Sequence, residues 1–126
     1  MFSHMMVGAN DIEASKAFYD ATLGALGIEP GVIDPKGRCF YITKTGVFAI
    51  TTPINGEPAS AGNGSTIGFS AETTEMADAW YEIGLKNGGT VCEDLPGVRN
   101  APRGNLYLAY LRDPAGNKLC VLLPVA

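Results

Sequence analysis

The sequence predicts an α+β fold in which one β-α-β-β-β unit occurs twice in a chain of 126 residues. Two observations lead to this prediction: an internal repeat, and the same order of strand-like and helix-like segments in each half. A chain of this length fits one domain. We therefore expect a single domain over 1–126, with module one at about 1–55, a linker at about 53–64 and module two at about 65–126.

The repeat relates the two halves at an offset of 62 residues and is clearest in the predicted helices. Six pairs are identical and two are similar: Ala9/Ala71, Glu13/Glu75, Ala17/Ala79, Tyr19/Tyr81, Leu23/Leu85, Gly27/Gly89, Phe18/Trp80 and Asp20/Glu82. Matches in phase with one helix indicate a duplicated structural unit. A sheet covered by one helix leaves its other face for its counterpart or for a ligand.

In the first half, a helix capped by Asn10 or Asp11 follows the first strand and ends at Gly27, which tolerates a left-handed cap. The predicted strands of this half are 2–8, 31–34, 38–43 and 47–52. On the first strand, the apolar Met5 and Val7 should pack on the helix, so His4 should face the opposite side.

The second half repeats this order. It has predicted strands at 65–70, 90–94, 106–112 and 118–123, and a helix at about 74–87. The segment Asp113–Asn117 contains Pro and Gly and predicts the turn of the last hairpin. We interpret 95–104, which contains Pro, Gly and Arg, as a long loop that forms a flap or rim.

Composition limits the possible functions and the location of the protein. Hydrophobic residues make up 46% and the net charge is −4, so the chain is globular, and no basic run favours nucleic acid. Three cysteines without CxxC spacing predict neither a disulfide framework nor a zinc cluster. Without a signal peptide or a membrane-spanning stretch, we expect a cytoplasmic protein that binds neither nucleic acid nor membrane.

Three segments resemble the vicinal oxygen chelate superfamily, which includes glyoxalases, bleomycin resistance proteins and dioxygenases. Residues 11–19 (DIEASKAFY) are similar to its first helix, and residues 110–119 (YLRDPAGNKL) are similar to its closing hairpin. Residues 57–64 are similar to the segment before the second half in small bacterial glyoxalase-like members. The resemblance implies paired βαβββ modules, often a homodimer, and a cavity where a divalent metal binds vicinal oxygens of a substrate.

The resemblance also implies four symmetry-related metal-ligand positions. In this chain they hold His4, Ile50, Thr66 and Cys120. Catalytic metal sites normally use three or more His, carboxylate or thiolate ligands, and only His4 and Cys120 qualify. We therefore expect no cofactor; zinc, nickel, iron or manganese belongs to the alternative interpretation below.

Strand alternation predicts which side chains share the cavity. If the last hairpin pairs Arg112 with Lys118, Tyr110 lies opposite Cys120 on the cavity face. The predicted ligand-binding residues are His4, Thr66, Tyr107, Tyr110, Cys120 and Arg103. All of these except Thr66 also have a structural alternative: a hydrogen-bonded strand histidine, core packing for the cysteine and tyrosines, or a solvated loop arginine. No residue is assigned a catalytic role, although His4 could activate Cys120 as a nucleophile.

The favoured function is metal-independent binding of a small organic molecule in the cavity between the modules, as in bleomycin-resistance-type relatives. The alternative is a metal-dependent enzyme resembling lactoylglutathione lyase or a ring-cleaving dioxygenase. That reading lacks a carboxylate at all four implied positions. A domain for binding a protein partner is a third hypothesis, which the sequence neither supports nor excludes.

Overall fold

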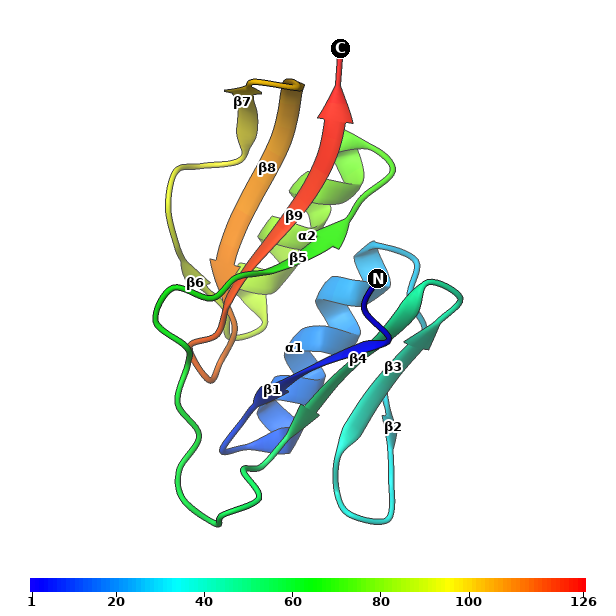
Figure 1. The fold of residues 1–126 in the computed structure, drawn as a ribbon, viewed down its shortest axis with the longest axis vertical. Helices are drawn as coiled ribbons and strands as arrows, with labels where there is room; N and C mark the ends of the chain where they lie inside the picture. Colours follow the sequence, from blue (N-terminus) through cyan, green and yellow to red (C-terminus); the bar gives the residue numbers. More distant parts are fainter.

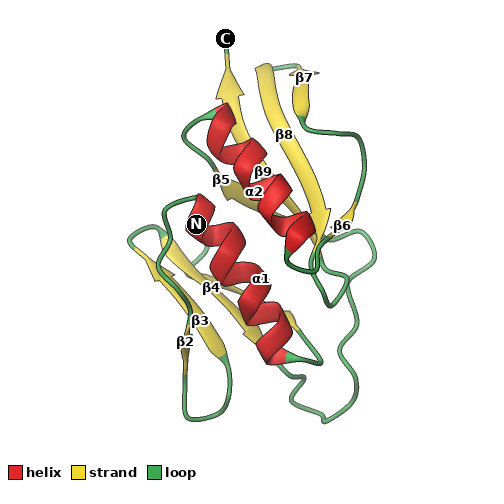
Figure 2. Cartoon of the chain, turned by 180° about the vertical axis from the view of Figure 1, so that it is seen from behind, coloured by secondary structure: helices red, strands yellow, loops and turns green.

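The computed structural model describes all residues 1–126 as two sheets with one helix each. Figure 1 shows the sheets in front and the helices behind them, and Figure 2 shows both helices from the other side. Module one contains β1 (His4–Gly8), α1 (Ile12–Ala25), β2 (Val32–Ile33), β3 (Cys39–Thr43) and β4 (Gly46–Thr51). Module two contains β5 (Ile67–Ser70), α2 (Thr74–Lys86), β6 (Thr90–Val91), β7 (Gly97–Ala101), β8 (Gly104–Arg112) and β9 (Lys118–Val125).

The two sheets have matching strand orders, which confirms the predicted α+β fold. The first sheet has the order β1-β4-β3-β2, and the second has β5-β9-β8-β6, with β7 also paired to β8. In each module the first and last strands are parallel neighbours, and the other pairs are antiparallel. The outer edges of β1 and β5 carry no strand partner, so the sheets remain separate.

The helix starts follow the repeat at the same offset. Asp11 caps α1 by accepting a hydrogen bond from the Ala14 amide at 3.1 Å, and Thr73 caps α2 through the Met76 amide at 3.1 Å. Of the two predicted caps, Asn10 and Asp11, the structure uses Asp11. Short oxygen-bearing side chains satisfy amides that have no partner within the first turn, which explains why both helices begin here.

The hydrophobic core lies between the helices and the sheets. It includes the repeat pairs Phe18/Trp80 and Tyr19/Tyr81. The helices pack on each other at Gly84, where a Cβ atom would collide with Leu111 and crowd Thr22. Glycine at this position therefore lets α2 approach both its own sheet and α1.

A buried polar network joins the two modules. Asp113, 3% exposed, accepts hydrogen bonds from the Tyr19 hydroxyl at 2.5 Å and from the Asn117 side-chain amide at 2.9 Å. The same Asn117 amide donates to the Gly8 carbonyl at 3.0 Å. Burial and the neighbouring Asp113 carboxylate raise the pKa of Tyr19 well above its usual value, so the phenol stays a donor. Through these hydrogen bonds, the turn of the last hairpin, which belongs to module two, binds α1 and β1 of module one.

One predicted loop is wrong. Residues 97–101 form β7, and β8 begins at Gly104, so most of 95–104 is a hairpin and not a flap. Ala101 pairs with Gly104, which leaves only Pro102 and Arg103 in the turn, and Gly104 has a φ of 122°. The Pro and Gly signals mark this tight turn and not a long irregular segment.

The predicted strand 65–70 is also shorter in the structure, because β5 begins at Ile67 and Thr66 lies before it. No helix is long and apolar enough to span a membrane.

Candidate binding site between the two modules

A pocket of about 390 Å³ lies between the unpaired edges of β1 and β5. Ten of its 17 lining residues are hydrophobic. Consecutive residues contribute from each side, with Ser3 just before β1 and His4 and Met5 on β1 on one side, and Gly68, Phe69 and Ser70 on β5 on the other. The volume falls within the usual range for small-molecule sites.

Aromatic rings from both modules form part of the wall. Phe48 on β4 meets Phe69 on β5 edge to face, with ring centroids 5.2 Å apart and an interplanar angle of 84°. Both side chains line the pocket. Edge-to-face contacts are a favoured aromatic geometry, so this pair ties the two modules together beside the pocket.

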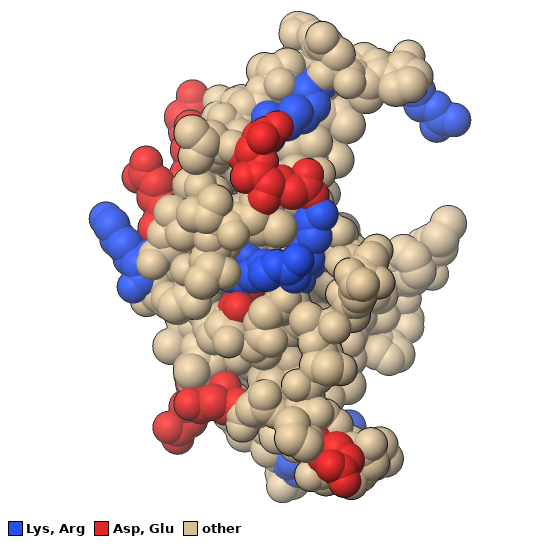
Figure 3. All heavy atoms as spheres, turned by 90° about the vertical axis from the view of Figure 1, so that its left-hand side faces the viewer, with Lys and Arg blue, Asp and Glu red and all other residues tan.

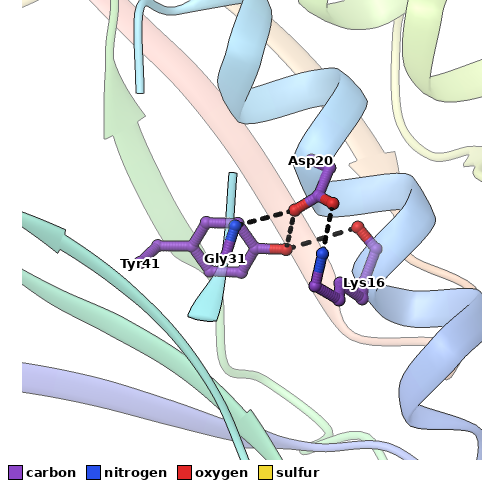
Figure 4. A network of polar contacts seen from close by, with 4 residues as sticks. All are labelled: Lys16, Asp20, Gly31 and Tyr41. Carbon is purple, nitrogen blue, oxygen red and sulfur yellow. Dashed lines mark hydrogen bonds and ion pairs between the residues drawn. The ribbon is translucent and has the colours of Figure 1, made fainter. Parts of the chain in front are cut away.

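Tyr41 supplies a third ring, and its hydroxyl is fixed on the side of α1. Figure 4 shows this hydroxyl donating to Asp20 Oδ1 at 2.9 Å, while the Gly31 amide also donates to that oxygen at 2.9 Å. Lys16 pairs with the other Asp20 oxygen at 2.7 Å. Burial raises the pKa of Tyr41, and Asp20 raises it further. Burial opposes ionisation of Asp20, but the bonds from Lys16, Gly31 and Tyr41 together hold its pKa below the usual value.

The polar side chains of the lining are hydroxyl groups and the His4 ring. No Asp, Glu, Lys or Arg side chain lines the pocket. The Ser3 hydroxyl lies 2.8 Å from His4 Nδ1, and the Thr43 hydroxyl donates to the Gly46 carbonyl at 2.8 Å. The charged side chains lie elsewhere: Figure 3 shows acidic and basic groups interspersed on one outer face.

Of the predicted ligand-binding residues, only His4 lines this pocket. Thr66 is exposed ahead of β5, and Arg103 is exposed in the β7–β8 turn. Tyr107 pairs with Leu123, a core residue, and so lies on the helix side of its sheet. Its hydroxyl donates to Asp78 on α2 at 2.6 Å, and this hydrogen bond, with burial, raises the pKa of Tyr107 to about 12.

Tyr110 and Cys120 lie together on the open face of the second sheet. Arg112 pairs with Lys118 in the last hairpin, and Tyr110 lies opposite Cys120, as the sequence predicts for this register. Lys118 Nζ lies 5.2 Å from the centre of the Tyr110 ring and forms an ion pair with Glu93. Burial raises the pKa of the Cys120 thiol, which keeps it protonated and a poor nucleophile at neutral pH.

The register corrects the position assigned to Ile50. Ile50 is fully buried in the core on the helix side. Met6 pairs with Ala49, as Gly68 pairs with Cys120, and Met6 and Gly68 are related by the repeat offset. Ala49 is therefore the counterpart of Cys120, and the open face of module one has no donor atom there.

The residues present do not fit the divalent metal that the resemblance implies. Ala49 has no donor atom, Thr66 is a weak ligand, and His4 and Cys120 are the only good ligands among the implied positions. No three His, Cys, Asp or Glu side chains gather closely enough to hold an ion together. A catalytic site built on two ligands would bind a divalent cation weakly.

Comparison with protein families decides the relationship. The model of the Glyoxalase/Bleomycin resistance protein/Dioxygenase superfamily matches residues 1–121. The chain belongs to this superfamily. The resemblance to the vicinal oxygen chelate superfamily is thus confirmed over nearly the whole chain. The two sheets, with their parallel pairs β1–β4 and β5–β9, agree with the paired modules that the resemblance implies. A search among curated proteins found no match.

Solved structures of the superfamily are similar along the whole chain. A glyoxalase/bleomycin resistance protein from Albidiferax ferrireducens T118 is 61% identical, with a TM-score of 0.94 over 97% of this chain and 98% of that one. A family enzyme from Burkholderia phytofirmans PsJN is 18% identical, with a TM-score of 0.73 and 98% of both chains covered. Lactoylglutathione lyase from Agrobacterium tumefaciens is 23% identical, with a TM-score of 0.66 over 97% and 92%. The last two show only the shared fold.

Sequence reasoning missed the part of the pocket near the end of α1. Leu23, Leu26 and Ile28 line it, together with Phe48 and Phe69. Alternation predicts that Phe69 faces the helix, and it does. Strand alternation does not indicate that a pocket opens between the two modules beside Phe69, because the pocket depends on how the modules pack.

Proposed function

We propose that the protein binds a small organic molecule, without a metal, in the pocket between β1 and β5. The observation that carries the proposal is a pocket of about 390 Å³ with a mainly apolar lining, in which His4 is the only good metal ligand. Apolar walls supply affinity through burial, and a few polar groups orient the bound molecule. The poor fit of the implied metal positions supports binding without a cation.

His4 is proposed to contact the ligand. It lies on β1 at the pocket, and its Nδ1 atom is already 2.8 Å from the Ser3 hydroxyl. This contact orients the ring and leaves the second ring nitrogen for a ligand hydrogen bond. Tyr110 and Cys120 lie on a different surface and are not part of this proposed site.

Metal content and thermal stability together test the proposal. Protein purified without chelator should contain well below one zinc, nickel, iron or manganese ion per chain, and EDTA should leave its melting temperature unchanged. Small organic molecules that bind should raise the melting temperature with EDTA present, because a ligand that binds only the folded state stabilises it. His4→Ala should reduce that increase, whereas Arg103→Ala, in an exposed turn, should not.

A near-stoichiometric metal that His4→Ala removes would overturn the proposal. Ligand stabilisation that requires a metal would also contradict metal-free binding. Ligand stabilisation that persists undiminished in His4→Ala would contradict the assignment of the pocket.

We also propose that the protein forms a homodimer in the cytoplasm. Val32 and Ile42, on the side of the first sheet away from the helix, are 64% and 69% exposed, and a second chain could cover them. Three cysteines without disulfides support a reducing compartment. Sedimentation of the wild type and of Ile42→Lys tests the dimer: the wild type should sediment as a dimer, and Ile42→Lys should shift it toward monomer.

A further inference from the structure

We propose that the pocket between β1 and β5 selects an uncharged, flat aromatic molecule with one or two hydrogen-bonding groups. The proposal rests on the proposed function and adds the chemical class of the ligand. Three features of the pocket lead to it: the aromatic residues in its lining, the absence of Asp, Glu, Lys and Arg, and the small number of polar side chains still free to bond.

The walls favour a flat ring. Phe48 and Phe69 come from different modules and stand nearly perpendicular, at 84°, with centroids 5.2 Å apart. Tyr41 adds a third ring to the same pocket. Phe48 and Tyr41 are almost completely buried, so a ligand would meet chiefly the partly buried Phe69 and the exposed Phe2. A flat aromatic ligand can stack on these rings or meet their edges, which adds favourable contacts to the burial of apolar area.

The lining disfavours an ionised ligand. Asp, Glu, Lys and Arg are all absent from it. Lys16 and Asp20 lie behind Tyr41, but each already pairs with the other at 2.7 Å. An ammonium group would find no acidic side chain in this site, and a carboxylate would find only the His4 ring, so the lining offers little compensation for the lost hydration of either group.

Few polar side chains in the pocket remain free for a ligand. The Tyr41 hydroxyl donates to Asp20, the Thr43 hydroxyl donates to the Gly46 carbonyl, and the Ser3 hydroxyl bonds His4. Among the side chains, the second ring nitrogen of His4 and the Ser70 hydroxyl are left, while the Thr45 hydroxyl lies 3.2 Å from that of Thr43. The outer edges of β1 and β5 add main-chain N–H and C=O groups that have no strand partner. The side chains can therefore satisfy one or two hydrogen bonds of a ligand, and any further polar group would depend on the main-chain groups of the two strand edges.

Calorimetric titration of the full chain with 2-naphthol and 2-naphthoate tests the class directly. The two probes share one ring system and differ in charge. We expect 2-naphthol to bind at least about tenfold more tightly, a difference of about 1.4 kcal/mol. Ser70→Ala should weaken 2-naphthol by about fivefold through loss of one hydrogen bond, and should leave naphthalene binding unchanged.

A charge placed at the pocket rim should change the selectivity. Thr45 lines the pocket from an exposed turn, so Thr45→Lys adds a cation there without disturbing the core. It should tighten 2-naphthoate by about tenfold and leave 2-naphthol nearly unchanged, because only the anion gains a partner. Ile54→Lys is the matched control: it adds the same charge at a fully exposed position that does not line this pocket.

The outcomes separate this inference from the proposed function. Binding of 2-naphthoate to the wild type as tightly as 2-naphthol would overturn the ligand class. Equal effects of Thr45→Lys and Ile54→Lys would overturn the location. If neither probe binds but another metal-free molecule binds through His4, the ligand class fails and the proposed function stands. If no small molecule binds, both fail.

Discussion

The two modules share a backbone plan. On the sheet faces that point away from the helices, each module carries an aromatic ring with a cation beside it, but the cation comes from a different position in each. In module one, Phe40 pairs with Ala49, and in module two Tyr110 pairs with Cys120 at the matching register position. A cation lies 5.2 Å from each ring centre: Arg38 over Phe40, and Lys118 over Tyr110.

The two cationic residues occupy different positions relative to the strand that carries the aromatic ring. Arg38 precedes the strand of its own ring and pairs with Asp34 at 2.5 Å, whereas Lys118 comes from the neighbouring strand and pairs with Glu93. Glu93 has a φ of 60°, a backbone conformation that non-glycine residues rarely adopt. Equivalent sheets can thus carry similar side-chain groupings that are not related by the repeat.

Substitutions in the hydrogen-bond network that joins the modules, Asp113 with Tyr19 and Asn117, should have the largest effect on stability. Asp113→Ala should lower the free energy of unfolding by about 3 kcal/mol, because Tyr19 and Asn117 lose a shared buried acceptor. Urea denaturation followed by circular dichroism measures the change. A loss below about 1 kcal/mol, the value of an ordinary hydrogen bond, would mean that the network does not hold the modules together.

The repeat-related tyrosines Tyr19 and Tyr81 provide a matched pair. The Tyr19 hydroxyl donates to Asp113, whereas the Tyr81 hydroxyl forms no hydrogen bond within the chain. Tyr19→Phe should cost about 2 kcal/mol of unfolding free energy, and Tyr81→Phe less than about 0.5 kcal/mol. The same denaturation experiment compares the two variants. Equal losses of unfolding free energy would contradict the inference that only the Tyr19 hydroxyl stabilises the contact between the modules.

The helix caps should behave alike, since their geometry is the same in both modules. Asp11→Ala and Thr73→Ala each remove a side-chain acceptor that bonds an amide at 3.1 Å. Each should lower the unfolding free energy by about 1 kcal/mol. A difference between them of more than about 1 kcal/mol would show that the modules do not share this feature energetically.

The smallest expected effect concerns Tyr107 in module two. Its hydrogen bond to Asp78, with burial, raises its pKa to about 12. Because the folded pKa lies above the unfolded value, the stabilisation is complete below the unfolded pKa of about 10 and is lost as the pH rises through about 12.

Ultraviolet absorbance measures this titration directly. The wild type should contain a late-ionising phenol that Tyr107→Phe removes. In Asp78→Asn the same phenol should ionise at lower pH, because the carboxylate that opposes its ionisation is gone. An unchanged absorbance curve in Asp78→Asn would contradict the assigned cause.

Local sequence patterns were sufficient for the helices and for the last hairpin. Asp11 and Gly27 marked the ends of the first helix, and the Asp113–Asn117 turn marked the last hairpin, whose register pairs Arg112 with Lys118 in the structure. The error at Ile50 has a specific origin. Only Lys44 and Thr45 separate the paired Thr43 and Gly46, whereas five residues, 113–117, separate Arg112 from Lys118. Matching the two hairpins glycine to glycine therefore shifts the register by one and reverses the face.

The sequence alone determined the duplicated α+β plan, because strand period, helix caps and turn residues act over short distances. The family relationship and the scarcity of metal ligands at the implied positions also followed from the sequence, through the resemblance of three segments to a known superfamily. Only the tertiary structure decided where the pocket lies. Its walls come from β1, β4, β5 and the end of α1, and the space between them depends on how Asp113, Tyr19 and the helix contact at Gly84 set one module against the other. No local pattern encodes that packing angle.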